Sequence, residues 1–426
     1  MVIAQAAEDD LAARVERLCR AARAASREMA FASTAAKNAA LMGAATSLRD
    51  SADLLLDANR ADVEGAHAAG LSPSLVDRLT LTAARIASMA AGLEKIAALP
   101  DPVGETIAQW RVPNGLEITQ LRVPLGVVGI IYESRPNVTA DAAGLCLKAG
   151  NAVVLRGGSE AKASNAAIAQ TLARAVAAAG LPPAAVQAPA EGGRDAVRIL
   201  LKQNRYIDVI VPRGGESLIR TVTELSRIPV IQHFAGVCTT YVDAAADLAM
   251  AEQIAWNAKV QRPGVCNAME NLLVHRDVAE RFLPPMIARF RAAGVEIRGC
   301  ERTRGIVPGV VAATESDWST EYLDLILAVK VVDSLEDAIT FISTYGSGHS
   351  DAIVTDHYPS ARRFQRAVDS AAVFVNASTR FNDGFEFGFG AEIGISTNRL
   401  HARGPMGLRE LTTYKYVIQG SGQIRE

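Results

Sequence analysis

The residues best suited to catalysis surround one cysteine, Cys266, in the stretch Gln-Arg-Pro-Gly-Val-Cys-Asn-Ala at 261–268. Residues 245–258 have the pattern of a helix and 271–275 that of an apolar strand, so the cysteine lies in a loop between two rigid elements. Loops held in this way are common positions for catalytic groups. The loop is therefore a suitable position for a nucleophilic thiol.

Two cationic residues, Lys259 and Arg262, precede this cysteine. Positive neighbours favour the thiolate, which is the form of cysteine that attacks a carbonyl carbon. A lone cysteine is more often a small buried hydrophobic residue, so residue type alone leaves both interpretations open. The elements around the loop must decide between them.

Paired glycines follow an arginine at the ends of two predicted strands, in Arg156-Gly157-Gly158-Ser159-Glu160 and in Pro212-Arg213-Gly214-Gly215-Glu216-Ser217. Glycine permits close backbone approach, and the N–H groups at the start of the following helix attract phosphate. Because arginine bonds phosphate through two parallel N–H groups, such sites suit a dinucleotide with an extra 2′-phosphate. Neither stretch is the Gly-x-Gly-x-x-Gly fingerprint, and glycines at strand ends are more often plain turns.

The elements that position these residues begin with a helical segment at 8–98, which predicts a layer covering a sheet. A hairpin is predicted at 104–123, around Pro113-Asn114-Gly115, because Asn-Gly between alternating segments is a strong turn signal. This hairpin either packs on its own domain or pairs with another subunit. The sequence leaves both arrangements open, and it does the same for a strand at 413–418.

From residue 124 onward, strands and helices alternate in two blocks, which predicts two parallel, doubly wound sheets of an α/β fold. In the first block, strands are expected at 126–132, 152–156, 185–188, 207–211 and 229–232, and helices at 138–149, 161–179, 193–204 and 215–226. In the second block, strands are expected at 239–242, 271–275, 325–332, 352–355 and 372–375, and helices at 245–258, 277–292, 335–344 and 359–369.

Ligands of such sheets bind at the carboxyl ends of the strands, so a cleft between the two blocks is the expected site. Two polar stretches should flank it, Tyr132-Glu133-Ser134-Arg135-Pro136-Asn137 and Asn376-Ala377-Ser378-Thr379-Arg380-Phe381-Asn382. Each is also compatible with a plain solvated loop.

Composition restricts the class of partner. The 426 residues carry a formal net charge of −2 and contain no basic cluster, so neither nucleic-acid binding nor membrane binding is expected. The N-terminus lacks the pattern of a secretory signal, and the longest apolar run is too short to span a bilayer. The five cysteines are widely spaced and odd in number, which indicates neither a disulfide framework nor a zinc site and favours a reduced, cytoplasmic setting. A small-molecule substrate is the expected partner.

Several motifs together resemble the γ-glutamyl phosphate reductase (glutamate-5-semialdehyde dehydrogenase) family of the aldehyde dehydrogenase superfamily, over the chain from about residue 10 to its end. They are Arg122-Val123-Pro124-Leu125-Gly126-Val127-Val128-Gly129, Tyr132-Glu133-Ser134-Arg135-Pro136-Asn137-Val138-Thr139, Gln261-Arg262-Pro263, Cys266-Asn267, Val375-Asn376-Ala377-Ser378-Thr379-Arg380-Phe381 and His401-Ala402-Arg403-Gly404-Pro405-Met406-Gly407-Leu408.

The resemblance implies an aldehyde-dehydrogenase-like fold of two doubly wound αβα domains with an oligomerisation hairpin. It implies an NADP-binding domain at 1–103 and 124–236, and a catalytic domain with the nucleophilic cysteine at 237–410. The hairpin at 104–123 would join the strand in 411–426 to form the oligomerisation element of a homo-oligomer.

The implied reaction is the NADPH-dependent reduction of L-glutamyl 5-phosphate to L-glutamate 5-semialdehyde and phosphate, the second step of proline biosynthesis. Cys266 would form the thioester, and Asn137 would stabilise the oxyanion together with the backbone N–H of Cys266. The substrate's carboxylate and phosphate would be held by Arg135, Arg262, Ser378 and Arg380. Functional coupling to glutamate 5-kinase, which makes the unstable substrate, is also implied.

The cofactor implied by the resemblance is NADPH or NADP⁺. Arg156 and Glu160 match the position that binds the adenosine ribose, and Glu321 matches the glutamate that holds the nicotinamide ribose. The remaining expected cofactor contacts are the phosphate-loop residues Gly157, Gly158, Ser159, Arg213, Gly214 and Gly215.

One departure concerns the stretch Pro229-Val230-Ile231-Gln232-His233-Phe234-Ala235-Gly236. Hydrolytic aldehyde dehydrogenases have a water-activating glutamate here, and its absence favours an acyl-phosphate substrate over hydrolysis. His233 and Phe234 are unusual for the family, in which small residues are common. A coenzyme A-acylating dehydrogenase also lacks the glutamate, but it should not need the polar arginine loops. A non-enzymatic relative should have lost the cysteine or the glycine sites, which are intact.

Overall fold

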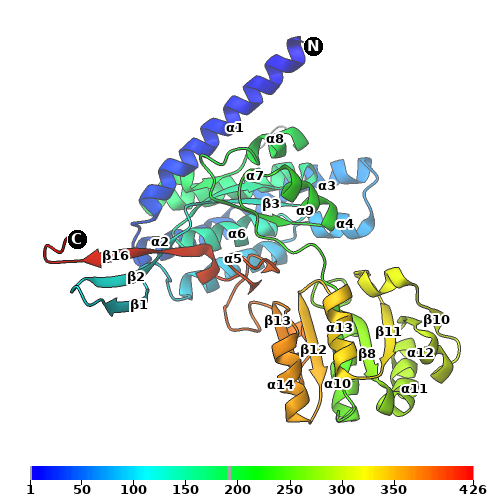
Figure 1. Ribbon diagram of the computed structural model, residues 1–426. Coiled ribbons are helices and arrows are strands. Elements are labelled where there is room, and N and C mark those ends of the chain that lie inside the picture. Colours follow the sequence, from blue (N-terminus) through cyan, green and yellow to red (C-terminus); the bar gives the residue numbers. More distant parts are fainter. Residues whose placement is uncertain (1, 190–192, 426) are drawn as a thin grey trace. The chain divides into compact units, whose positions relative to one another are not determined.

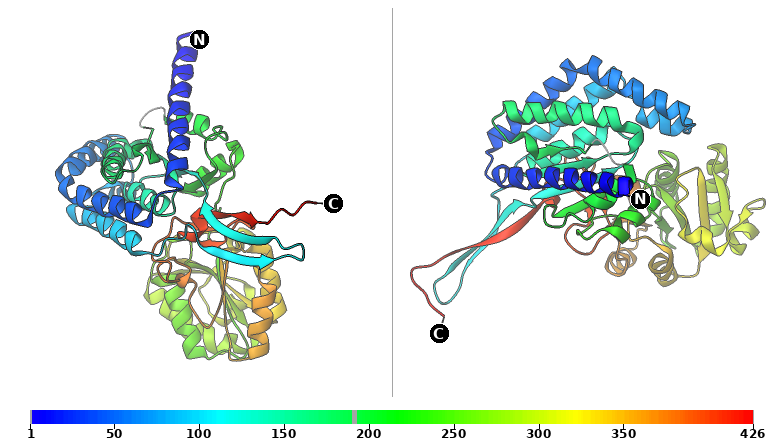
Figure 2. Two further views of the ribbon diagram at one scale, coloured as in Figure 1. Left: turned by 90° about the vertical axis from the view of Figure 1, so that its left-hand side faces the viewer. Right: turned by 90° about the horizontal axis from the view of Figure 1, so that it is seen from above.

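The computed structural model describes residues 2–189 and 193–425, and the chain divides into two compact units (Figures 1 and 2). Unit 1 comprises Met1–Gln232, Phe389–Gly394 and Met406–Glu426, and unit 2 comprises His233–Gly388 and Ile395–Pro405. Unit 1 therefore starts the chain and also receives its end. The expected catalytic domain at 237–410 starts within unit 2, but the segments 389–394 and 406–410 return to unit 1.

The helical layer of unit 1 is confirmed. Ser33, Ser72 and Thr82 stand at helix N-caps, where each side chain accepts a backbone N–H of the first turn. Alanine and leucine form the buried faces, and α2 packs against both α5 and α7. The helices are α1 (Val2–Met29), α2 (Thr34–Asp50), α3 (Ala52–Ala68), α4 (Pro73–Leu79) and α5 (Ala83–Ala98).

A four-stranded parallel sheet in the order β5-β4-β3-β6 forms the centre of unit 1. Strands β3 and β4 are buried at every residue, as continuous apolar runs predict. The strands are β3 (Val127–Tyr132), β4 (Ala152–Arg156), β5 (Val186–Gln187) and β6 (Val209–Arg213). The helices are α6 (Asn137–Lys148), η1 (Ser159–Ala161), α7 (Lys162–Ala178), η2 (Pro183–Ala185), α8 (Gly193–Leu200) and α9 (Glu216–Leu225).

The prediction of a full strand at 229–232 is wrong. In the described chain the strand is reduced to one bridge between Val230 and Ile210. Pro229 has no N–H to extend the ladder, and the chain enters unit 2 directly after Gln232. Strand β6 also extends two residues beyond the expected end at 211, so that Pro212 and Arg213 belong to the strand rather than to the following loop.

The predicted hairpin is confirmed by strands β1 (Thr106–Arg111) and β2 (Glu117–Pro124), which pair antiparallel. Gly115 adopts φ +86° in the turn, a conformation that favours glycine. The C-terminal strand β16 (Thr412–Gln419) pairs with β2 of the same chain along its whole length. These segments, far apart in sequence, form one three-stranded sheet.

Unit 2 contains a seven-stranded parallel sheet in the order β10-β9-β11-β8-β7-β12-β13. Its strands are β7 (Cys238–Val242), β8 (Met269–His275), β9 (Glu296–Gly299), β10 (Val311–Ala312), β11 (Ile326–Val332), β12 (Ser350–Val354) and β13 (Ala372–Val375). Its helices are α10 (Leu248–Val260), α11 (Arg276–Ala292), α12 (Glu301–Ile306), η3 (Glu315–Ser319), α13 (Leu335–Tyr345), α14 (Tyr358–Ala367) and η4 (Thr379–Phe381). The short elements β9, α12 and β10 were not predicted, because each spans too few residues to show a periodicity.

Two backbone hydrogen bonds join the two segments that return to unit 1. The Ile393 N–H donates to the Met406 carbonyl (2.9 Å), and the Met406 N–H donates to the Gly394 carbonyl (2.8 Å). The segment between them forms the short pair β14 (Ile395–Ser396) and β15 (Gly404–Pro405), and η5 (Arg409–Leu411) leads into β16.

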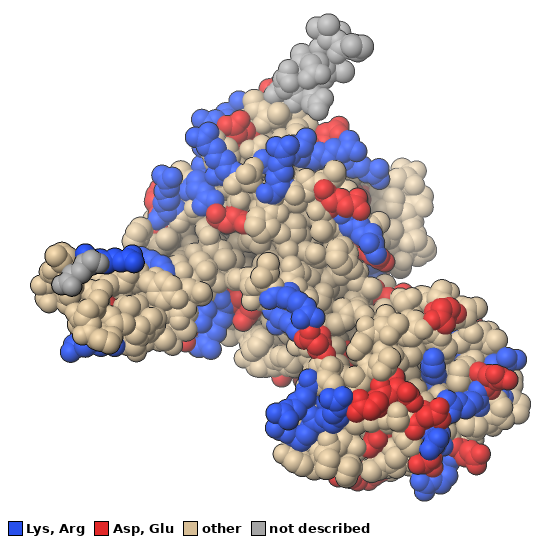
Figure 3. Space-filling view, viewed as in Figure 1, with Lys and Arg blue, Asp and Glu red and all other residues tan. Residues whose placement is uncertain are grey.

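Both charge signs occur on the surface of each unit in the view of Figure 3. No helix of the described chain is long and apolar enough to cross a membrane.

Candidate active site

The loop of Cys266 joins α10 to β8, as expected from the sequence. The cysteine is half-buried, whereas Arg262 earlier in the loop is exposed. A buried ion pair connects the two elements, since Nζ of Lys259 in α10 lies 2.6 Å from a carboxylate oxygen of Glu270 in β8. This pair closes the loop at its base.

The charges of this buried pair compensate each other, so Lys259 is mainly a partner of Glu270 rather than a cation offered to the thiol. Burial lowers the pKa of Lys259, and it raises the pKa of Glu270 to about 7 against the opposing effect of the ammonium group. Arg262 and Arg380 are the positive groups left beside the loop.

The backbone of Cys266 is packed against Gly236. A Cβ on Gly236 would overlap the Cys266 carbonyl group, and the contact is with backbone that cannot rotate away. The Cys238 thiol also donates to the Cys266 carbonyl (3.2 Å). Close approach by a glycine and a thiol hydrogen bond therefore set the position of the Cys266 peptide.

Asn267 joins the cysteine loop to the polar loop that follows β13. Its Nδ2 donates to the carbonyls of Arg380 (3.3 Å) and Asn382 (3.0 Å), and its own carbonyl accepts from Thr379 Oγ1 (2.8 Å). The Arg380 guanidinium donates to Oδ1 of Asn267 and to Oε1 of Gln261 (2.9 Å). These bonds hold the loops 261–268 and 376–382 side by side within unit 2. The sequence motif included Asn267 without suggesting this role.

Two guanidinium groups meet beside the cysteine. Burial lowers the pKa of Arg380, and the like charge of nearby Arg262 lowers it further, whereas Cys266 acts in the opposite direction. Ser378 is buried, and its Oγ accepts the Arg380 N–H (3.3 Å), so its side chain organises the loop. The structure thus brings Cys266, Arg262, Ser378 and Arg380 together, in a position to attract an anionic ligand.

Two histidines form part of the same site, although no sequence motif groups them. One ring nitrogen from each of His233 and His349 and the Sγ of Cys266 all lie within 4.8 Å of one another. His349 is buried, and burial, followed by the nearby His233, lowers its pKa to about 3. His233 was noted only as unusual for its position, and His349 belongs to no predicted motif.

Glu321 lies elsewhere in unit 2, between η3 and β11, where its side chain is half-buried. Its charge acts on Glu270, whose pKa it raises after the larger effect of burial. Glu321 therefore lies in the electrostatic neighbourhood of the buried pair at the base of the cysteine loop.

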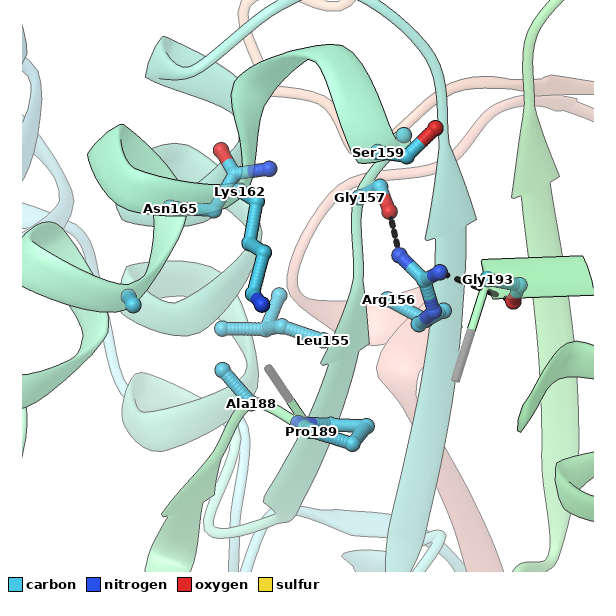
Figure 4. Close-up of a pocket in the computed structure, with 11 residues that line it drawn as sticks. Leu155, Arg156, Gly157, Ser159, Lys162, Asn165, Ala188, Pro189 and Gly193 are labelled. Carbon is cyan, nitrogen blue, oxygen red and sulfur yellow. Dashed lines mark hydrogen bonds between the residues drawn. The ribbon is translucent and has the colours of Figure 1, made fainter. Parts of the chain in front are cut away.

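In unit 1, the loop after β4 lines a cavity of about 240 Å³ (Figure 4). Its lining includes Arg156, Gly157, Gly158 and Ser159, which were predicted from sequence, and Lys162, which was not. The Arg156 guanidinium donates to the carbonyls of Gly157 and, at 2.9 Å, of Gly193, while the Lys162 side chain runs along the cavity (Figure 4). Arg156 therefore ties two loops together, and its Nε is buried with no hydrogen-bond partner among the described residues.

The paired glycines of unit 1 permit close contacts with carboxylates. The Glu160 carboxylate folds over Gly158 and accepts from the backbone N–H and the hydroxyl of Ser134 (2.7 Å each). The Glu133 carboxylate accepts from the Gly215 N–H (3.0 Å) at the start of α9, where it also leaves no room for a side chain at Gly214. In this conformation a protein carboxylate occupies the helix start at which a ligand phosphate was expected.

Asn137 begins α6 and is exposed, and its Nδ2 donates to Oδ2 of Asp141 (3.1 Å). Arg135 is exposed two residues earlier, and Arg213 ends β6, from where its charge acts on Asp141. These residues all belong to unit 1, whereas Cys266 belongs to unit 2.

Comparisons with known proteins identify the family of the chain. The model of the aldehyde dehydrogenase family matches residues 1–304. Gamma-glutamyl phosphate reductase from Moorella thermoacetica is 60% identical over 405 residues, which cover 95% of this chain and 97% of the relative. The same enzyme from Caldanaerobacter subterraneus subsp. tengcongensis is 58% identical over 412 residues, covering 97% of this chain and all of the relative.

A solved structure gives the same result for the fold. The crystal structure of gamma-glutamyl phosphate reductase from Thermotoga maritima is 48% identical and superposes with a TM-score of 0.95, covering 97% of this chain and 100% of that one. The expected aldehyde-dehydrogenase-like α/β fold is confirmed. The chain belongs to the aldehyde dehydrogenase family and, within it, to the gamma-glutamyl phosphate reductases.

Proposed function

We propose that this protein reduces L-glutamyl 5-phosphate to L-glutamate 5-semialdehyde and phosphate with NADPH, the second step of proline biosynthesis. The observation that carries the proposal is the cluster of Cys266 with Arg262 and Arg380, in a chain 60% identical to a gamma-glutamyl phosphate reductase. A half-buried thiol with cationic neighbours is suited to attack an anionic acyl compound.

The thiolate of Cys266 attacks the acyl carbon, the C–O bond to phosphate breaks, and the phosphate leaves with a proton taken from solvent. The backbone N–H of Cys266 and the Asn137 amide donate to the oxyanion, and each such donor contributes about 10² to 10³ in rate. NADPH, when bound, supplies the hydride that reduces the thioester carbon. The C–S bond then breaks, which releases the aldehyde and restores the thiolate.

The arginine side chains match the charges of the substrate. Glutamyl phosphate carries a phosphate at one end and an α-carboxylate at the other, and guanidinium groups bond both kinds of anion bidentately. Arg262 and Arg380 hold one end beside Cys266, and Arg135 holds the other. Ser378 keeps the Arg380 loop in place through its cap.

The stretch before Gly236 supports an acyl-phosphate substrate. Its residues Gln232, His233 and Phe234 supply no carboxylate that could activate water. A thioester that is not exposed to an activated water survives until reduction. This is the property that acyl-phosphate chemistry requires.

Unit 1 holds the cofactor in this proposal, and its loops fit a phosphorylated dinucleotide. The glycines after β4 allow the backbone to approach a ligand, and the cavity presents the cation of Lys162 and the hydroxyl of Ser159. We assign the adenosine ribose to Arg156 and Glu160. Arg213, Gly214 and Gly215 would hold a phosphate after it displaces the Glu133 carboxylate from the Gly215 N–H. Glu321 is assigned to the nicotinamide ribose.

The preference for NADPH is tested at Lys162. Because its ammonium group would pair with the 2′-phosphate, Lys162→Ala should raise the KM for NADPH by about tenfold, in line with loss of a charged hydrogen bond, and leave the KM for NADH unchanged. Lys202→Ala, on the surface of the same unit, is the control. Equal effects on both cofactors would assign Lys162 a structural role.

We further propose that the protein acts in the cytoplasm as a homo-oligomer, with the sheet β1-β2-β16 as the oligomerisation element. A reduced compartment suits a thiolate nucleophile. Functional coupling to glutamate 5-kinase would deliver the unstable acyl phosphate before it hydrolyses.

The reverse reaction tests the proposed function. Glutamate 5-semialdehyde and NADP⁺ are mixed with the enzyme, and NADPH formation is followed with phosphate, without phosphate, or with coenzyme A. Strict dependence on phosphate is expected. Activity that ignores phosphate or prefers coenzyme A would assign the chain to another reaction of the superfamily.

Cys266→Ala should lower turnover by at least about a thousandfold, as loss of a nucleophile does, while NADPH binding measured by fluorescence stays nearly unchanged. Cys300→Ala is the matched control, since Cys300 is also half-buried in unit 2 but caps α12.

A further inference from the structure

Three side chains that zinc prefers as ligands converge in unit 2. The Sγ of Cys266 and one ring nitrogen from each of His233 and His349 lie within 4.8 Å of one another. The three residues come from separate segments: the entry to unit 2, the cysteine loop and the residue before β12. Thiolate sulfur and imidazole nitrogen without a carboxylate favour a borderline-soft cation such as Zn²⁺ over Mg²⁺ or Ca²⁺.

The hydrogen bond of His233 determines which of its ring nitrogens carries the proton. Nδ1 lies 2.9 Å from the carbonyl oxygen of Ile395, and a carbonyl can only accept, so Nδ1 carries the proton. Nε2 then has the lone pair. Metal-bound histidines are commonly oriented in this way, by donation of the other ring N–H to a backbone carbonyl.

The hydrogen bonds around Ser350 give the same result for His349. The Ser350 hydroxyl oxygen accepts from Nδ2 of Asn382 (2.7 Å), and the hydroxyl hydrogen-bonds to the thiol of Cys238. With its one proton used there, Ser350 accepts from Nδ1 of His349 at 2.8 Å. The remaining lone pair belongs to Nε2 of His349, which is buried and has no hydrogen-bond partner in the part of the chain that the structure describes.

We propose that Cys266, His233 and His349 form a binding site for Zn²⁺, with the sulfur of Cys266 and Nε2 of both histidines as ligands. Tetrahedral zinc with ordinary bond lengths separates its ligand atoms by about 3.3–3.6 Å, so a small rotation of the half-buried side chains closes the present arrangement. Three protein ligands leave a fourth position for water. The buried Nε2 of His349 gains the partner that polar groups in protein interiors normally have.

Zinc binding has a direct consequence for the nucleophile. A sulfur that donates its electron pair to the metal cannot attack an acyl carbon, so zinc inhibits the enzyme reversibly. This consequence rests on the proposed function, in which Cys266 is the nucleophile, whereas binding itself does not. A binding measurement therefore separates failure of the metal site from failure of the proposed reaction.

The test measures Zn²⁺ affinity of the reduced full chain by competition with a fluorescent zinc chelator, without substrate or cofactor. One Zn²⁺ per chain is expected. His233→Ala should weaken binding by at least about tenfold, since loss even of an outer-shell partner costs tenfold or more. Cobalt in place of zinc should give a thiolate-to-metal charge-transfer band, which Cys266→Ser should abolish.

Two matched controls identify adventitious binding. His357→Gln and Cys300→Ser remove a histidine and a cysteine of the same unit outside the cluster, and both should bind zinc as the unchanged chain does. His349→Asn should also weaken binding, and a thermal melt checks that this buried substitution still folds; His233, which is only half-buried, gives the deciding result. Retention of full affinity by His233→Ala, or absence of the cobalt–thiolate band, would overturn the site.

Zinc should also protect Cys266 from alkylation by iodoacetamide, as detected by mass spectrometry of the digested chain. Protection should disappear when a chelator removes the metal, and it should be lost in His233→Ala at the same zinc concentration. Equal alkylation of Cys266 with and without zinc would contradict the proposal.

Discussion

At the scale of single residues, Gly236 has no reactive side chain, yet it affects the position of the Cys266 backbone. It is the absence of its side chain that lets the chain pass against the Cys266 carbonyl. The Cys238 thiol bonds the same carbonyl, so two neighbours hold the carbonyl side of the Cys266 backbone, next to the N–H of the same residue that would face the oxyanion.

Gly236→Ala should therefore displace the backbone of Cys266, and with it the N–H that would face the oxyanion. Because loss of one oxyanion donor costs about 10² to 10³ in rate, turnover in the reverse reaction should fall by at least about a hundredfold. Gly305→Ala is the control, because a Cβ there meets nothing within 4 Å. A Gly236→Ala enzyme of normal turnover would show that the Cys266 peptide tolerates displacement.

Asp141 gives a prediction about pH. Burial raises its pKa from 3.8 to about 6, against the Asn137 hydrogen bond and the charge of Arg213. Between these two values the folded protein holds a proton that the unfolded chain has released, so stability falls as pH rises through this window.

Asp141→Asn cannot titrate. The free energy of unfolding of Asp141→Asn minus that of the unchanged chain should therefore rise by up to about 2–3 kcal/mol from about pH 4 to pH 7. Urea unfolding at a series of pH values measures the difference. A difference that does not change with pH would mean that Asp141 has an ordinary pKa in the folded state.

At the scale of elements, helix α10 and strand β8 are held at the base of the cysteine loop by the pair Lys259–Glu270. Both side chains are buried, so each charge depends on the other. The pair lies between the last turn of the helix and the second residue of the strand, where it limits how far the loop can open.

Glu270→Gln should destabilise the protein by about 3–5 kcal/mol, because it leaves a buried ammonium group without its counter-ion. The double variant Lys259→Met with Glu270→Leu should recover most of this loss, since apolar side chains of similar size need no counter-ion. Both are measured by urea unfolding.

The control for this prediction is the exposed pair Arg363–Glu336, where Glu336→Gln should change stability little. If the double variant were no more stable than Glu270→Gln, the pair would contribute through specific geometry rather than through charge compensation.

At the scale of the whole molecule, the sheet β1-β2-β16 exposes an unusual number of large apolar side chains. Tyr414, Tyr416 and Ile418 alternate along β16 and so share one face, and the Trp110 ring of β1 contacts Tyr416 edge to face. All four are more than two-fifths exposed. Contiguous apolar patches of this kind mark contact sites with other chains.

If the sheet is the proposed oligomerisation element, Tyr416→Glu should lower the molar mass measured by light scattering after size-exclusion chromatography, because a charge would be buried in the contact between subunits. Tyr358→Glu, on a highly exposed tyrosine of α14 in unit 2, should leave the mass unchanged. An unchanged mass for Tyr416→Glu would contradict the proposal that this sheet is an oligomerisation element.

The sequence by itself determined the alternating α/β architecture, the hairpin at Asn114-Gly115 and the loop of Cys266, because these depend on local periodicity, turn residues and motifs. It also identified the loops of Arg156 and Arg380. It did not reveal the short elements β9 and β10, whose few residues show no pattern, or that the strand at 229–232 would be cut to one bridge.

Only the tertiary structure decided which distant residues meet. It paired β16 with β2 of the same chain, placed Glu133 at the start of α9, and brought His233 and His349 to Cys266. The physical reason is that such contacts join segments that strand order and loop packing bring together, and residue spacing along the chain contains no record of them.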